Sequence, residues 1–290
     1  FWSPATNKRN DEYNGNLSNR TKFSLKVIEA IRKSVGPDFI VGVRMVADED
    51  WDRGLSKEEG LEIVKKIIDT KKVDFLNIIR GHIDTDASLT KVIPTQGMTS
   101  SPHLDFAGEI KFESKFPVFH ASKINDVATA RFAIESGKLD MVGMTRAHIA
   151  DPHIVKKIID GKENTIRPCV GATYCLDRIY EGNEALCIHN PATGREKFIP
   201  HEILIKADKK KKIVIVGAGP AGLEAAKVSS ERGHEVIVFE ASNKAGGQLN
   251  LITRSKRRKD MLGIIDWRLE ACNDNNVTFN YNTFATKEII

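Results

Sequence analysis

The sequence predicts an α/β protein built from two parallel sheets that follow one another along the chain. Up to about residue 150, short apolar runs alternate with helical patterns, and a glycine-rich turn opens a second unit of the same kind after residue 213. Strands that alternate with helices pair in parallel through right-handed crossovers. The 290 residues are 41% hydrophobic and 29% charged, which is typical of a globular protein and excludes a collagen, a coiled-coil rod or a disordered chain.

Four apolar runs in the N-terminal part predict strands buried on both faces, at 39–45, 73–79, 116–120 and 139–144. Apolar residues at helical spacing predict a helix over 23–35, which Gly36-Pro37 ends. A capping box, Ser56-Lys-Glu-Glu59, opens a second helix, and a third covers 126–136. Four such units do not close a barrel, so we expect either a smaller doubly wound sheet or a piece of a longer protein.

A second α/β unit begins after a linker. Residues 151–208 show no regular pattern and are expected to be irregular. A strand over 213–216, a helix over 221–232 and a strand over 235–239 then follow. We expect the chain to stop before the third strand of this unit.

Charge and hydropathy exclude two classes of partner. The net charge of +5 is mild. The two densest basic runs, Lys209–Lys212 and Lys256–Lys259, are typical of a solvated linker or helix surface. No apolar run approaches the roughly 18–20 residues of a membrane span. We therefore expect neither a nucleic-acid nor a membrane partner, and the cytoplasm as the location.

The segment Gly217-Ala-Gly-Pro-Ala-Gly222 follows a predicted strand directly and opens a predicted helix. Gly217 allows the tight turn, Gly219 lets the backbone approach a pyrophosphate, and Gly222 lets the helix pack on the strand. Glu240 ends the next strand, where its carboxylate would accept hydrogen bonds from ribose hydroxyls. The pattern predicts a site for an adenine dinucleotide.

Three of the four cysteines, Cys169, Cys175 and Cys187, lie within 19 residues. Thiolates this close together suit an iron–sulfur cluster or a zinc ion in a reducing compartment. A metal-free loop with buried thiols is the alternative. Cys272 is far away in the sequence and is expected to be an ordinary buried cysteine.

Several segments resemble one flavoprotein family. Arg167-Pro-Cys-Val-Gly-Ala-Thr-Tyr-Cys-Leu-Asp-Arg178 and Cys187-Ile-His-Asn-Pro-Ala-Thr-Gly-Arg195 are similar to the cluster loop of the trimethylamine dehydrogenase and 2,4-dienoyl-CoA reductase family, which is old yellow enzyme-like. The segment from Asn7 to Arg20 resembles the part of that family after barrel strand four. Within the family, the chain most resembles demethylases that act on N-methylproline or dimethylglycine.

The resemblance implies the C-terminal half of an FMN-binding TIM barrel over 1–160, an iron–sulfur loop and linker over 161–208, and the start of a Rossmann-like FAD/NAD(P)-binding domain over 209–290. The chain would then be a fragment whose isolated form is inactive, with the family's catalytic Tyr/His pair upstream of Phe1. Glu240-Ala-Ser-Asn-Lys-Ala-Gly-Gly-Gln248 also looks like the second signature of two-dinucleotide flavoproteins. It places Gly246 and Gly247 near the nucleotide and favours FAD or ADP over NAD(P).

The resemblance also assigns residues to the flavin. Arg44, expected near the C-terminal end of its strand, would face the FMN pyrimidine, as TIM-barrel chemistry gathers at that end. Ser122 and Lys123 stand where the family has Gly-Arg at the phosphate, and Thr145 and Arg146 match its second phosphate loop. Either Asp84 or Asp86 corresponds to a further acidic residue of the site, a choice that stays open. His82 and His120 at strand ends are either substrate-binding or structural.

One departure affects the cluster. The family's loop reads Cys-x-x-Cys-x-x-Cys, and its middle cysteine is replaced here by Ala172. The three remaining thiolates would hold a 3Fe-4S cluster, or a 4Fe-4S cluster with a fourth ligand such as His189 or water.

The resemblance implies an FMN enzyme that oxidises a small N-methyl amine and passes electrons through the cluster to an electron-transfer protein or to the second nucleotide site. The alternatives are an NADPH-dependent enoate or 2,4-dienoyl-CoA-type reductase, and a catalytically incomplete nucleotide-binding fragment. The oligomeric state is left open, a homo-oligomer included.

Overall fold

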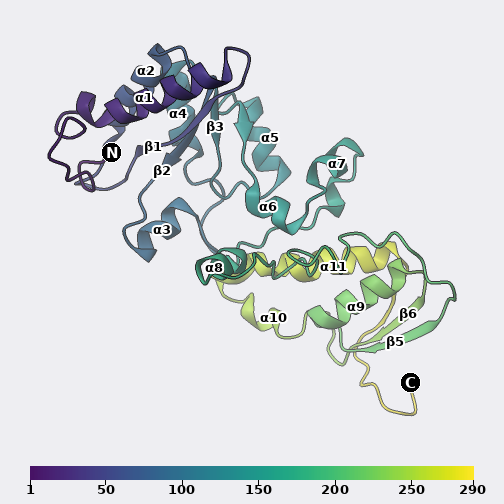
Figure 1. Cartoon of the computed structure of the whole chain (residues 1–290). Helices are drawn as coiled ribbons and strands as arrows, with labels where there is room; N and C mark the ends of the chain where they lie inside the picture. The colour runs from purple at the N-terminus through teal and green to yellow at the C-terminus, as the bar shows by residue number, and fades with distance from the viewer. The chain divides into compact units, whose positions relative to one another are not determined.

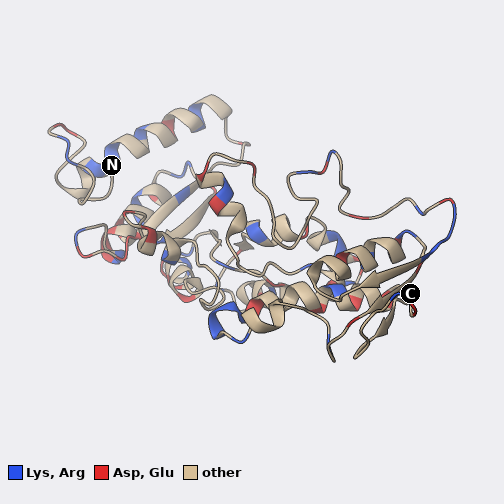
Figure 2. Cartoon of the chain, turned by 90° about the horizontal axis from the view of Figure 1, so that it is seen from below, with Lys and Arg blue, Asp and Glu red and all other residues tan.

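The computed structural model describes residues 1–290, which form two compact units. The N-terminal unit contains residues 1–94 and 99–145, and the C-terminal unit contains residues 95–98 and 146–290. Each unit has its own hydrophobic core. Lys and Arg are interspersed with Asp and Glu along both units (Figure 2), and none of the helices is both long and apolar enough to cross a bilayer.

The N-terminal unit contains a four-stranded parallel sheet in the order β1-β2-β3-β4 (Figure 1). The strands are β1 (Gly42–Asp48), β2 (Phe75–Arg80), β3 (Val118–His120) and β4 (Met141–Val142). The helices are α1 (Leu17–Val35), α2 (Lys57–Asp69), α3 (Asp86–Val92), α4 (Leu104–Ser114) and α5 (Val127–Glu135), and α6 (Thr145–Ala150) begins at its end.

The four strands and three of the helices confirm the predictions from the sequence. Ser56 caps α2 by accepting a hydrogen bond from the backbone N–H of Glu59, as the capping box requires. The strand boundaries move, because Phe39 and Ile40 are 61% and 71% exposed and precede β1. Helices α3 and α4 were not predicted, and α3 buries none of its residues.

Helices α2 and α4 pack on the sheet, and α1 packs on α2. Leu76 and Ile78 of β2 are fully buried on the face that meets Ile63 and Ile67 of α2 and Ile110 of α4 in one core. Because side chains alternate along a strand, the residues between them lie on the opposite face. That alternation separates the apolar core from the face that carries Arg44 and Asn77.

The C-terminal unit contains a three-stranded parallel sheet in the order β5-β6-β7. The strands are β5 (Lys212–Val216), β6 (Glu235–Phe239) and β7 (Thr278–Asn280). The helices are α7 (Ile154–Ile159), α8 (Tyr174–Tyr180), α9 (Pro220–Glu231), α10 (Leu249–Ile252) and α11 (Gly263–Asp274), with 3₁₀ turns at Glu163–Thr165 and Lys256–Leu262. Helix α9 packs on β5 and β6, and α11 packs on α9 (Figure 1).

Two expectations about this unit were wrong. The chain does reach a third strand, since β7 pairs in parallel with β6. The three residues of β7 have mixed polarity, so their sequence gives little indication of a strand, and pairing with β6 stabilises that strand. The segment 151–208 is also not wholly irregular, because it contains the short helices α7 and α8. Its helical turns are too short for their apolar residues to show a period.

Gly60 provides a test of how α2 packs on β1. A Cβ atom at this position would overlap the backbone carbonyl of Ala47. In an isolated helix, Gly60→Ala would stabilise by about 1 kcal/mol. Here we expect it to destabilise the protein by about 1–3 kcal/mol through overpacking, measured as a lower thermal midpoint. Glu58→Ala, on the exposed side of the same helix turn, serves as the control, and a raised midpoint in Gly60→Ala would contradict the packing.

Candidate functional site

The first candidate site is the sheet face and carboxyl edge of β1–β4. Arg44 lies third among the seven residues of β1, so the expectation that it sits near the C-terminal end of the strand was wrong. The strand starts later than predicted and continues to Asp48, because β1 pairs with β2 from Gly42 onward. The Arg44 side chain is exposed and lies opposite the buried Met45 and Ala47.

The face that carries Arg44 is lined by polar and aromatic groups. Asn77 of β2 is the register partner of Arg44. Phe75 stacks on Phe119 with 4.2 Å between ring centroids. Gly42 is required beside them, because a Cβ atom there would overlap the Phe75 ring. This face therefore combines a cation, an amide and flat rings.

Besides Arg20 Nε, five buried polar atoms of the N-terminal unit have no hydrogen-bond partner. They are Asn77 Oδ1, Ser101 Oγ, His103 Nδ1, His120 Nε2 and Ser122 Oγ. Buried polar side-chain atoms are nearly always paired, so a group of exceptions needs an explanation. All five come from β2, β3 or the loops beyond their carboxyl ends. Such a set fits a polar ligand with several hydrogen-bonding groups.

The tautomer of His120 is defined by its surroundings. Its Nδ1 lies 2.7 Å from the carbonyl oxygen of Ile78, which can only accept, so Nδ1 carries the proton. Burial lowers the pKa of His120, with the positive charges of His103 and Arg44 adding to the effect. The ring is therefore neutral, and Nε2 is an acceptor without a donor.

The loops after β3 and β4 approach each other closely. A Cβ atom at Gly143 would overlap Ala121, and the Gly143 N–H donates to the His120 carbonyl at 2.8 Å. Lys123 has a left-handed backbone with φ of +52°, a conformation that costs energy in a non-glycine residue and gathers at functional sites. Ser122 and Lys123 are buried, while Thr145 begins α6 as an exposed residue. Arg146, in the C-terminal unit, has a buried Nη1 without a partner.

Neither acidic candidate lies on a strand. Asp84 is exposed and pairs with Arg53 at 3.5 Å, and Asp86 is the first residue of α3. His82 donates from Nδ1 to the Glu49 carbonyl at 2.8 Å and stacks on Trp51. These contacts give His82 a structural role in joining the loops after β1 and β2, and they leave the choice between the two carboxylates open.

The second candidate site is the glycine-rich turn between β5 and α9. Gly217 has a φ of +95°, which favours glycine. A Cβ atom at Gly222 would overlap the Gly217 carbonyl, whereas a Cβ atom at Gly219 would meet nothing within 4 Å. Gly222 thus allows the close contact between helix and strand, and the space above Gly219 is open to a ligand.

Gly246 and Gly247 lie against this turn. The Gly246 N–H donates to the Ala218 carbonyl at 2.8 Å, and a Cβ atom at Gly247 would lie 3.3 Å from Gly219 Cα. Glu240 accepts from the N–H groups of Ala218 at 2.7 Å and Ser242 at 2.8 Å.

The environment of Glu240 keeps it ionised. Burial opposes ionisation, but the two backbone hydrogen bonds outweigh it and lower the pKa of Glu240. A carboxylate has about four acceptor positions, so two positions remain for ribose hydroxyls. Glu240 thus both ties the turn to the end of β6 and keeps acceptor capacity.

The third candidate site is the cysteine loop. Cys169, Cys175 and Cys187 line one small cavity together with Arg146, Ala172 and His189. Burial raises the pKa of the Cys169 and Cys175 thiols, and the positive charge of Arg146 opposes the rise. No group of three or more His, Cys, Asp or Glu side chains is arranged to hold a metal ion directly. Cys272 is fully buried, as expected, and burial raises its pKa to about 12.

His189 also lines this cavity. Its Nδ1 lies 2.9 Å from the Pro168 carbonyl, and burial, followed by the charge of Arg268, lowers the pKa of His189 to about 2. The ring is neutral, and its buried Nε2 is an acceptor without a partner. The His189 N–H also points to Cys187 Sγ at 3.4 Å. Three thiols and one free imidazole nitrogen are thus donors that iron accepts.

Sequence reasoning missed Asn77, Ser101 and His103. A polar residue inside the apolar run 73–79 was the available signal for Asn77. Ser101 and His103 lie in a loop without a motif, and only the fold brings them toward Lys123, whose carbonyl accepts from the Ser101 N–H at 3.3 Å.

Two segments of the chain match known families. Residues 1–165 match the NADH:flavin oxidoreductase / NADH oxidase family, and residues 215–275 match the NAD(P)-binding Rossmann-like domain. The first match covers more than half of the chain.

Similar proteins include amine demethylases and reductases. The chain is 60% identical, over its whole length and 43% of the relative, to a protein named as a probable N-methylproline demethylase from Rhizobium meliloti (strain 1021). It is 48% identical, over 98% of the chain and 41% of the relative, to a multifunctional alkene reductase/demethylase from Caballeronia cordobensis. A 2-naphthoyl-CoA reductase structure matches 99% of the chain and 43% of its own chain with a TM-score of 0.91 and 29% identity. The chain thus spans about two fifths of the length of these proteins.

The glycine-rich turn gives a test that separates binding from folding. Gly219→Val places its side chain in open space, so the thermal midpoint should stay unchanged while affinity for ADP falls by at least about tenfold, because the pyrophosphate loses its approach to the backbone. Gly222→Ala should instead lower the midpoint, since its Cβ overlaps backbone. Calorimetric titration of the full-length protein with ADP measures the first effect, and undiminished affinity in Gly219→Val would rule out nucleotide binding at this turn.

Proposed function

The chain belongs to the NADH:flavin oxidoreductase / NADH oxidase family, and we propose that it is the flavin-, thiolate- and nucleotide-binding part of an FMN enzyme that oxidatively demethylates a small N-methyl amine. The observation that carries the proposal is the set of five unpartnered buried polar atoms around β2 and β3. They fit the hydroxyl, phosphate and ring groups of a flavin. The 60% identical relative named for N-methylproline demethylation supports the substrate class.

We assign the flavin ligands as follows. Arg44 faces the ring, where its guanidinium stabilises negative charge on the reduced pyrimidine. Ser122, Lys123, Thr145 and Arg146 hold the phosphate, with charge from the two cations and hydrogen bonds from the others. His120 accepts a hydrogen bond from a flavin hydroxyl through Nε2. The proposed flavin-binding part covers 1–160, the cysteine loop and linker 161–208, and the nucleotide-binding part 209–290.

When bound, FMN would supply the acceptor for a hydride from the N-methyl carbon, and hydrolysis of the resulting substrate iminium would break its C–N bond to give formaldehyde and the demethylated amine. The residues of this chain act by orientation and charge. Arg44 stabilises the negative charge that the flavin carries after the transfer. The neutral His120 keeps Nε2 free to accept a hydrogen bond and does not take up a proton. The catalytic acid or base stays unassigned, with Asp84 and Asp86 as the candidates of this chain.

We further propose that Cys169, Cys175 and Cys187 hold an iron–sulfur cluster that carries electrons away from the flavin. The charge of Arg146 opposes the raised pKa of the Cys169 and Cys175 thiols, and we assign His189, which lines the same cavity, as the fourth ligand in place of the thiol that Ala172 lacks. The turn with Gly217, Gly219 and Glu240, together with Gly246 and Gly247, binds the adenosine part of FAD or ADP. An electron-transfer protein is the proposed final acceptor.

A second candidate function is reduction of an activated alkene with NADPH. The relative named for both alkene reduction and demethylation favours it, as does the likeness to a CoA-thioester reductase. Anaerobic mixing of full-length protein with N-methylproline or with NADPH distinguishes the two. Flavin bleaching with formaldehyde release by the amine supports demethylation. The protein would be assigned to alkene reduction if NADPH bleaches the flavin, cinnamate restores its colour, and amines have no effect.

Arg44 gives a test of the flavin assignment. Arg44→Ala removes an exposed side chain and should leave the thermal midpoint unchanged. We expect it to slow flavin reduction in stopped flow by about 10²–10³-fold, the cost of losing one charge-stabilising donor. Arg44→Lys should give an intermediate rate, because lysine keeps the charge but lacks the planar, two-pronged guanidinium. Arg232→Ala, which removes an exposed arginine that belongs to none of the candidate sites, is the control. Equal reduction rates in Arg44→Ala and the wild type would show that Arg44 does not touch the flavin.

The cysteine loop gives a test of the cluster. Serine at Cys169, Cys175 or Cys187 should remove iron and sulfide from anaerobically purified full-length protein, whereas Cys272→Ser should keep both. Ala172→Cys should restore four thiolates and lower the reduction potential, because a thiolate replaces a neutral ligand. If the wild type contains no iron and sulfide, the loop is a metal-free structural segment.

A further inference from the structure

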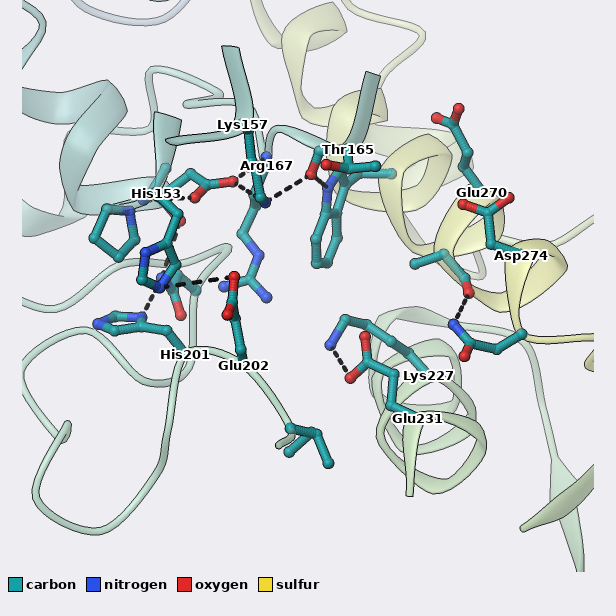
Figure 3. A pocket seen from close by; sticks show the side chains of 18 of the residues that line it. His153, Lys157, Thr165, Arg167, His201, Glu202, Lys227, Glu231, Glu270 and Asp274 are labelled. Carbon is teal, nitrogen blue, oxygen red and sulfur yellow. Dashed lines mark hydrogen bonds and ion pairs between the residues drawn. The ribbon is translucent and has the colours of Figure 1, made fainter. Parts of the chain in front are cut away.

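The C-terminal unit contains a cavity that none of the sites above uses. It has a volume of about 400 Å³, within the range of small-molecule pockets. Its walls come from α7 and the loop before it, the segment 164–167, the loop 201–206 and the C-terminal turns of α9 and α11 (Figure 3). The glycine-rich turn and the three clustered cysteines do not line it.

Arg167 is the unusual residue of this cavity. Its side chain lines the wall but is only 6% exposed. The guanidinium makes no hydrogen bond or ion pair within the protein, and its Nε is a buried atom without a partner. It lies over the ring of Trp267, 4.2 Å from the centroid, and the indole N–H donates to the Thr165 carbonyl at 2.9 Å. The stacked ring thus holds a planar cation in place without neutralising it.

The other buried cations of the cavity are already paired. Lys157 donates to Asp151 at 2.6 Å and to the Thr165 carbonyl at 2.9 Å. Lys227 donates to Glu231 at 2.8 Å.

Glu224 and Asp151 attract the charge of Arg167, but their direct ion pairs are with Arg268 and Lys157. A buried charge without a direct partner is costly, and a guanidinium pairs best with a planar carboxylate through two parallel hydrogen bonds. Arg167 therefore lacks the kind of partner that a ligand carboxylate would supply.

The remaining charges limit the ligand. The cavity is lined by four Lys or Arg and five Asp or Glu residues, so its net charge is −1 with neutral histidines. A phosphate or nucleotide would be repelled by this balance. Glu202, Glu270 and Asp274 also line the cavity (Figure 3). All three carboxylates are exposed, and Glu270 and Asp274 have no ion-pair partner in the structure. They provide counter-charge for a cation.

We propose that this cavity binds a small zwitterion of the amino-acid class, with its carboxylate on Arg167 and its cationic nitrogen toward the acidic rim. The nucleotide turn and the three clustered cysteines do not line this cavity, although Arg167 comes two residues before Cys169. The proposal does not depend on the proposed function.

The test is calorimetric titration of the full-length protein with L-proline, acetate and inorganic phosphate. We expect L-proline to bind more tightly than acetate, and phosphate not to compete. Arg167→Met should weaken L-proline binding by at least about tenfold, the scale of one lost charge-assisted pair. Arg232→Met, at an exposed arginine after α9 that does not line the cavity, should bind as the wild type does.

A second set of variants covers the case in which Arg167→Met does not fold. Glu202→Gln and the double variant Glu270→Gln with Asp274→Asn change exposed residues. At least one of them should weaken L-proline binding while leaving acetate binding unchanged. An unchanged L-proline isotherm in every folded variant, or displacement of L-proline by phosphate, would overturn the proposal. Flavin reduction by N-methylproline is measured in parallel, so a failure of the proposed function is seen separately.

Discussion

The carboxyl edge of the N-terminal sheet contains five buried polar atoms without protein partners, and the proposed flavin site depends on them. Parallel pairing directs the carboxyl ends of all four strands to one edge. Helices α2 and α4 bury Leu76 and Ile78 on one face, which leaves Arg44 and Asn77 on the other. Unpaired buried acceptors cost free energy, so a chain that keeps five of these polar atoms together is expected to pair them with a ligand.

The C-terminal unit satisfies its polar groups in a different way. Glu240 uses a buried carboxylate to join the glycine-rich turn to the end of β6, and Gly246 joins the following loop to the same turn. These bonds shape the turn before any nucleotide arrives. His189 and Arg167 are among the exceptions in this unit, together with Arg146 and the ion pair of Arg268 with Glu224, since each keeps a buried atom without a hydrogen-bond partner. His189 and Arg167 therefore point to ligands.

Local signals in the sequence predicted much of the fold. The capping box at Ser56, the glycine spacing from Gly217 to Gly222 and the apolar runs of β1 and β2 are each contained in a few residues. Features that depend on distant partners were missed or misplaced. Arg44 was placed at a strand end because the boundaries of β1 are decided by pairing with β2, and β7 was not expected because three residues gain strand character only beside β6.

The candidate sites also divide into those that local sequence patterns predicted and those that depend on residues far apart in the sequence. The cysteines and glycines were found from their spacing, and the structure brings each set together. The polar groups around His120 were not found, because Asn77, Ser101 and His103 come from separate segments without a motif. Their common property is an absent hydrogen-bond partner, which only a three-dimensional structure reveals.

The most direct measurement is the flavin content of the full-length protein. The protein is purified without added cofactor, denatured, and its released flavin is separated and quantified against the protein concentration. The account predicts one FMN for each chain, with any adenine-containing cofactor counted separately. Protein that is folded yet releases no FMN, and takes up none when FMN is added, would contradict the assignment of the unpartnered polar edge to a flavin.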